Sequence, residues 1–161
     1  MRRCSRPSRI SGESVSAPRA RRLPVPSDPL FVYGTLTFPE VLVELLGRTP
    51  RLDAARVSGR RAARLPGRVY PGLVTAAGAV TRGAVLRGLT AAEWRVLDDF
   101  EDDEYDLRPV FVHAGVSAHA AWTYVWTAEV LAADWSATAF ASDHLPRYAG
   151  RCVRWRTGPA V

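Results

Sequence analysis

Turn-forming glycines and prolines interrupt residues 52–89 at short intervals, and this spacing constrains the fold most. The interruptions are Gly59, Pro66-Gly67, Pro71-Gly72, Gly78 and Gly83. Runs this short are typical of strands in a curled or barrel-like sheet, whereas βαβ units need connections long enough to hold a helix. We therefore expect several short strands in this region.

A strand and a helix are predicted just before this region. Residues 30–33, Leu-Phe-Val-Tyr, form a short apolar run that Gly34 ends, as in a buried strand followed by a loop. Thr37 and Glu40 have the spacing of a capping box, which predicts a helix that begins there and ends at Gly47.

A second capping box, formed by Thr90 and Glu93, predicts another helix that ends at about Phe100 or Glu101. After it, alternating and helical apolar patterns predict two strands and a last helix, at about 108–113, 120–126 and 134–145.

The N-terminal residues differ in composition from the rest. Residues 1–30 hold five of the 12 prolines, six serines and seven arginines against two carboxylates. Such a segment buries too little apolar surface to offset its ordering entropy, so we expect a disordered tail over 1–29 and one domain over 30–161. Residues 31–161 hold fifteen arginines against fourteen carboxylates. Nucleic-acid binding, if any, is therefore expected from the tail alone.

Several classes of protein lack their required residues here. No apolar stretch approaches the ~20 residues of a membrane span. The two cysteines and three histidines have no metal-ligand spacing, so no metal site is expected. The motifs of serine hydrolases, phosphate-binding loops and dinucleotide-binding folds are absent. A reducing cytoplasm fits the low cysteine content.

Glu101 is a candidate catalytic residue on physical grounds. It follows Leu97 by four positions and Trp94 by seven, which places it on the apolar face of the predicted helix. Burial and the surrounding acidic run, residues 98–106, would both raise the pKa of its carboxyl group. A raised pKa suits a proton shuttle near neutral pH.

The other carboxylates of this run are expected to face water. The same helical spacing turns Asp99 and Asp102 away from the apolar face. An alternative for Glu101 itself is that the helix ends earlier, and that the side chain is solvated or paired with an arginine such as Arg108.

The turn at Tyr33-Gly34-Thr35-Leu36 is the second candidate site. A glycine there permits a positive φ or a close backbone approach, and N–H groups near a helix start can hold a carboxylate or a developing oxyanion. A purely structural turn between strand and helix is the alternative.

Two segments taken together resemble the γ-glutamylcyclotransferase-like family: Phe31-Val32-Tyr33-Gly34-Thr35-Leu36 and Val96-Leu97-Asp98-Asp99-Phe100-Glu101. Further likeness lies in Tyr70-Pro71-Gly72-Leu73, Gly83-Ala84-Val85-Leu86, Tyr105, Tyr124-Val125-Trp126 and the segment from Trp135 to Tyr148. The resemblance covers about residues 31–150. One departure is Leu107, because many members carry a basic residue there; Arg108 comes one position later, which leaves any arginine role open.

The resemblance implies an α+β fold, a small mixed β-barrel flanked by two or three helices. It also implies that Glu101 is the catalytic glutamate and that Tyr33, Gly34, Thr35, Leu36 and Tyr105 bind substrate. The implied reaction converts a small γ-glutamyl amine or γ-glutamyl peptide to 5-oxoproline and a free amine, without a cofactor. A second reading is a non-catalytic member of the same fold that binds a small ligand. The sequence does not determine the oligomeric state.

Overall fold

The computed structural model of the protein describes residues 24–25 and 27–158. Most of the predicted tail, residues 1–29, lies outside these residues. At the boundary, the Trp122 backbone N–H donates to the Pro29 carbonyl at 2.9 Å, and the Trp122 indole donates to the Asp28 carboxylate at 3.2 Å. The chain is therefore attached to the barrel from residue 28 onward.

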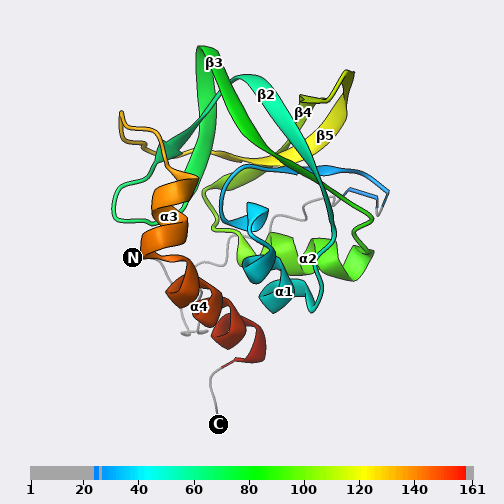
Figure 1. Ribbon diagram of the computed structural model, residues 1–161, viewed down its shortest axis with the longest axis vertical. Coiled ribbons are helices and arrows are strands. Elements are labelled where there is room, and N and C mark those ends of the chain that lie inside the picture. The colour runs from blue at the N-terminus through cyan, green and yellow to red at the C-terminus, as the bar shows by residue number, and fades with distance from the viewer. Residues whose placement is uncertain (1–23, 26, 159–161) are drawn as a thin grey trace, which may run out of the picture.

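Five strands of the described chain close into a barrel in the order β1-β3-β2-β4-β5 (Figure 1). Their bounds are β1 Leu30–Val32, β2 Arg51–Arg64, β3 Pro71–Arg87, β4 Tyr105–Ala114 and β5 Ser117–Trp126. β5 pairs with β1 in parallel at Leu30 and Trp122, and the other pairs are antiparallel. The implied mixed barrel is confirmed, as are the strands predicted near residues 30, 108 and 120.

The prediction of several short strands in residues 52–89 is wrong, because β2 and β3 are two long strands. Their pairing jumps from Ser58 with Val80 to Arg60 with Thr75. At this irregularity Gly59 and Gly78 take φ of 73° and 77°. The glycines thus bend a continuous ribbon, as β-bulges do, and do not end its strands.

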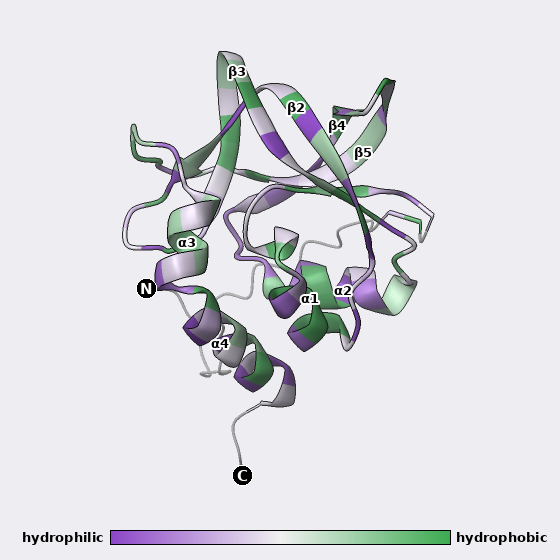
Figure 2. Cartoon of the chain, in the orientation of Figure 1, coloured by the Kyte–Doolittle hydropathy of each residue, from purple (hydrophilic) through white to green (hydrophobic). Residues whose placement is uncertain are grey.

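Helices lie mainly on one side of the barrel (Figure 1). They are the 3₁₀ turn η1 Thr35–Thr37 and the helices α1 Pro39–Leu46, α2 Ala91–Phe100, α3 Ala137–Asp143 and α4 Leu145–Thr157. The described chain therefore has four α-helices, where the resemblance implied two or three. Figure 2 shows hydrophobic and hydrophilic residues together on these helices, as expected when one face packs and the other is solvated.

The helix predicted over 134–145 is also wrong in its bounds. α3 begins after Ser136, whose hydroxyl caps the Ala139 N–H at 3.2 Å, and it ends at Asp143. α4 then begins with Pro146 in its first turn, where a proline costs no hydrogen bond. The buried Tyr148 and Cys152, four residues apart, were the helical signal for α4.

The predicted capping box at Thr37 does not form. Residues 35–37 make a 3₁₀ turn instead, and the Thr37 hydroxyl donates to the Gly34 carbonyl at 2.6 Å. The N-cap of α1 is Phe38, without a side-chain cap, and Pro39 occupies the first turn. The helix ends as predicted at Gly47, which has a left-handed φ of 75°.

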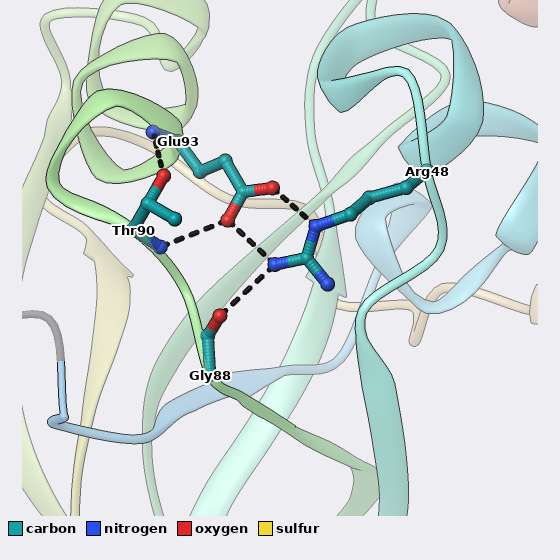
Figure 3. A network of polar contacts seen from close by, with 4 residues as sticks. All are labelled: Arg48, Gly88, Thr90 and Glu93. Atoms are coloured by element: carbon teal, nitrogen blue, oxygen red, sulfur yellow. Dashed lines mark hydrogen bonds and ion pairs between the residues drawn. The ribbon is translucent and has the colours of Figure 1, made fainter.

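The predicted capping box of α2 is present and is tied to the rest of the fold (Figure 3). The Thr90 hydroxyl accepts from the Glu93 N–H at 3.1 Å, and the Glu93 carboxylate accepts from the Thr90 N–H at 2.8 Å. Arg48, just after α1, donates to the same carboxylate at 2.6 and 2.7 Å and to the Gly88 carbonyl at 2.9 Å. This network fixes the start of α2, whose other end reaches the candidate site.

Two buried apolar clusters lie on either side of β1. Leu30 and Val32 belong to the larger one, which joins the barrel to the helices and contains Trp94 and Leu97 of α2. Phe31 points the other way, into a smaller cluster between the strands. The apolar face predicted for α2 is thus confirmed, and the ends of β1 and α2 are held in one core.

Candidate active site

A pocket of about 660 Å³, counted with its open mouth, forms where the end of β1, η1, the start of β3, the end of α2 and α4 meet. All of the site residues predicted from the sequence line it: Tyr33, Gly34, Thr35, Leu36, Glu101 and Tyr105. The two candidate segments are therefore walls of the same cavity.

Gly34 is required by a close contact and not by a positive φ. Its φ is −124°, but a Cβ at this position would lie 2.7 Å from the Pro71 side chain. The first hydrogen bond of η1 runs from the Thr37 N–H to the Gly34 carbonyl at 3.0 Å. The N–H groups of Thr35 and Leu36 precede that bond, so the 3₁₀ turn itself gives them no acceptor.

The Tyr33 hydroxyl fixes the wall next to this turn. It donates to the Tyr124 carbonyl at 2.6 Å and accepts from the Leu73 N–H at 3.2 Å. Burial raises the pKa of this hydroxyl well above its usual value, and the negative charge of Glu101 raises it further. Tyr33 therefore stays protonated and bridges β3 and β5.

Glu101 ends α2. Its backbone N–H still donates to the Leu97 carbonyl at 3.2 Å, but its ψ of 144° takes the chain out of the helix. The residue is half-buried and lines the pocket. Arg108, the arginine considered as its partner, instead pairs with Asp106 at 2.9 Å. Glu101 is thus neither paired with that arginine nor pointing away from the pocket.

Tyr105 begins β4 and is buried. Its hydroxyl donates to the Pro71 carbonyl. Burial raises the pKa of Tyr105 well above its usual value, with smaller contributions from Tyr33 and Glu101. Since Pro71 is the residue that contacts Gly34, Tyr105 holds the wall against which the turn packs.

The expectation that Asp102 points away is wrong. Asp102 lines the pocket and accepts a hydrogen bond from the Tyr70 hydroxyl, with the Arg68 Nε 3.9 Å from its carboxylate. Burial, and then the bond to Asp102, raise the pKa of Tyr70. The helical spacing failed here because α2 ends at Phe100.

Sequence reasoning missed other residues that line the pocket, namely Tyr70, Phe100, Tyr124, Tyr148 and Arg151, in addition to Asp102. Tyr70, Phe100, Tyr124 and Tyr148 belong to segments that carried the resemblance. Tyr148 and Arg151 lie on α4, and the Thr35 hydroxyl donates to the Tyr148 hydroxyl at 3.4 Å. Finding them required recognising α4.

Within the described residues, no three His, Cys, Asp or Glu side chains gather as ligands for a metal ion. None of the helices in the described ranges is both long and apolar enough to cross a membrane.

Similar proteins are found among curated plant proteins. AIG2-like protein C of Arabidopsis thaliana is 43% identical over 99 residues, which cover 60% of this chain and 58% of that protein. AIG2-like protein D of the same plant is 38% identical over 100 residues, which cover 60% of this chain and 66% of that protein. The chain therefore spans less than two thirds of the length of these relatives.

Solved structures share the fold. A solution structure of an Arabidopsis thaliana protein is 29% identical, with a TM-score of 0.61 over 76% of this chain and 86% of that one. A gamma-glutamyl cyclotransferase has a TM-score of 0.56 over 78% of this chain and 85% of its own, and its 14% identity indicates likeness of fold alone. The family model described as gamma-glutamyl cyclotransferase, AIG2-like, matches residues 30–139. This match confirms the resemblance: the chain belongs to the gamma-glutamyl cyclotransferase, AIG2-like family.

Proposed function

We propose that this pocket converts a γ-glutamyl amine or γ-glutamyl peptide to 5-oxoproline and a free amine. The observation that carries the proposal is that Glu101 and the Tyr33–Leu36 turn line one cavity. In the reaction, the α-amine nitrogen of the substrate bonds to its own γ-carbonyl carbon, and the bond from that carbon to the leaving nitrogen breaks. The protons lost by the α-ammonium are returned to the leaving nitrogen.

Glu101 is the proposed carrier of these protons. Tyr33 and Tyr105 are unsuited to act as bases near neutral pH, because their hydroxyl pKa values are raised and their protons are committed to carbonyl groups. The other pocket carboxylate is Asp102, which accepts a hydrogen bond from Tyr70 and does not occupy the glutamate position of the resembling segment, residues 96–101. Glu101 therefore carries the two protons that the α-ammonium loses as it becomes the ring N–H, one after the other, to the leaving nitrogen, which departs as a protonated amine.

The turn is proposed to bind the glutamyl end of the substrate through its backbone. The N–H groups of Thr35 and Leu36 have no acceptor within the 3₁₀ turn, and donors at a helix start favour a negative oxygen. They would hold either the developing oxyanion of the γ-carbonyl or the α-carboxylate. Gly34 allows this turn to lie against Pro71.

Positioning supplies much of the proposed rate acceleration. The nucleophile and the electrophile belong to the same molecule, so the pocket has to hold only a bent, ring-closing conformer. Effective molarities of well-oriented intramolecular reactions reach about 10⁵ M or more. The chemistry itself needs no cofactor, because no electron is transferred and the only shuttled group is a proton.

The direct test is to incubate the purified chain with a panel of γ-glutamyl amines and dipeptides, and to measure 5-oxoproline and free amine together. We expect equal amounts of the two products from at least one compound. Release of glutamate instead of 5-oxoproline would contradict ring closure. Saturable binding without either product would favour the alternative, a ligand-binding member of the fold.

A further inference from the structure

The helix α4 has no role in the reaction proposed above, and all of its charged side chains are positive. Its residues Arg147, Arg151, Arg154 and Arg156 are basic, and it contains no carboxylate. Of these arginines, only Arg151 is among the residues that line the pocket. A helix charged with one sign beside a cavity attracts ligands of the opposite sign.

Packing places Arg151 close to the end of α2. Arg151 follows Tyr148 by three residues and precedes Trp155 by four, so the three side chains share one face of α4. Both aromatic rings contact the ring of Phe100 edge-on, with centroids 6.4 and 5.4 Å away. Phe100 is the residue before Glu101, and both of them line the pocket together with Arg151.

Within the described residues, no ion pair is formed by the Arg151 guanidinium. The ion pairs among the described residues engage Arg48, Arg51, Arg61, Arg68, Arg87 and Arg108. No carboxylate in the described part of the chain pairs with Arg151, which is half-buried at the pocket. By contrast, Arg68, which lies near the pocket residue Asp102, is held by Glu104 at 2.9 Å and lies over the Trp126 ring.

The position of Arg151 along α4 indicates which part of a substrate it would meet. Tyr148 contacts Thr35 of the turn, and α4 runs from there away from the barrel (Figure 1). Three further residues move the chain about 4.5 Å along the helix, away from the turn. A substrate whose glutamyl end is held by the turn would therefore present its leaving group to Arg151.

We propose that Arg151 is a specificity-determining residue that binds a carboxylate on the leaving group. This inference rests on the proposed function, and it predicts which γ-glutamyl compounds are the preferred substrates. γ-Glutamyl derivatives of α-amino acids, which leave with a free carboxylate, are preferred over γ-glutamyl derivatives of neutral amines. A guanidinium and a carboxylate form paired, charge-assisted hydrogen bonds, which are stronger than bonds between neutral groups.

The test compares two compounds that differ only in that charge, γ-glutamyl-alanine and γ-glutamyl-alaninamide. We expect the wild-type chain to favour the carboxylate, by about tenfold to a hundredfold in kcat/KM. In Arg151→Gln this preference should fall to near unity through a higher KM for γ-glutamyl-alanine, while γ-glutamyl-alaninamide is turned over as before. Arg154→Gln is the matched control, because it removes the same charge from an exposed position of α4 and should keep the preference.

The outcomes separate this inference from the proposed function. If both compounds yield 5-oxoproline at equal rates, or if Arg151→Gln weakens both equally, the role of Arg151 is overturned and the reaction stands. If neither compound yields 5-oxoproline, calorimetric binding of the same two compounds decides about Arg151, and the proposed function fails if the rest of the γ-glutamyl panel gives no 5-oxoproline either. A preference for γ-glutamyl-alanine in binding that Arg151→Gln removes would support the inference. Equal or absent binding would overturn it.

Discussion

Burial raises the pKa of the Tyr33 hydroxyl, and the negative charge of Glu101, which lines the same pocket, raises it further. The two residues lie far apart in the chain, at the ends of α2 and β1, and they line one pocket because both elements pack into one apolar core. The pocket thus brings together the two sequence segments that a cyclotransferase would need.

Stability should fall at alkaline pH because of the pocket tyrosines. Tyrosine ionises at about pH 10 in an unfolded chain. Tyr33 and Tyr105 keep their protons to higher pH in the fold, since burial raises the pKa of each. Above pH 10 the unfolded state therefore binds fewer protons than the folded state, and the free energy of unfolding decreases as pH rises.

This pH range is easy to interpret because the chain contains no lysine. We expect urea unfolding at pH 9 to 11.5, roughly the range around the tyrosine pKa, to show a steady loss of stability. In Tyr105→Phe the loss should be shallower. A free energy of unfolding that stays level across this range in the wild type would contradict the raised pKa values.

Gly34→Ala should damage the site more than Thr35→Ala. A methyl group at position 34 would meet the Pro71 side chain at 2.7 Å, so the turn or β3 has to shift. Thr35→Ala removes one long hydrogen bond, to Tyr148 at 3.4 Å, and leaves the backbone donors in place. We expect a loss in kcat/KM of about a hundredfold or more for the first, because small misplacements are costly, and a loss below about tenfold for the second.

The same two variants can be compared by substrate turnover and by thermal unfolding. If Thr35→Ala proves the more damaging of the two for turnover, the threonine hydroxyl and not the backbone of the turn is the binding group.

Thr90→Ala should lower stability without altering catalysis. It removes the hydroxyl that accepts from the Glu93 N–H at the start of α2, at the opposite end from Glu101. The loss of such a cap costs about 1 kcal/mol. Denaturant unfolding should detect this cost, while kcat and KM remain at wild-type values. A large change in kcat would mean that the capping network also controls the position of Glu101.

The parts of the fold that sequence patterns could predict are those with local causes. The capping box at Thr90 and the apolar residues Trp94 and Leu97 determine α2 without help from distant segments. The bend of β2 and β3 was misread because glycines at a bulge look like glycines at a turn. Only the pairing of the two long strands distinguishes the two cases, and pairing is not a local property.

The candidate site shows the same division. Glu101 and the Tyr33–Leu36 turn were found from short patterns and a resemblance, whereas Asp102 was missed because its direction depends on where α2 stops. Tyr148 and Arg151 reach the pocket through the packing of α4 against Phe100. That packing is a tertiary contact, and no residue near α4 in the sequence indicates it.

The most direct measurement of the central claim is 5-oxoproline release by Glu101→Gln, which keeps the shape of the side chain and removes its ability to carry a proton. We expect kcat to fall by at least about a hundredfold, the usual scale of general acid and base catalysis. The circular dichroism spectrum and the thermal transition should remain close to wild type. Asp103→Asn, an exposed neighbour in the same acidic run, serves as the control and should retain full activity. Turnover by a folded Glu101→Gln variant at the wild-type rate would contradict the account.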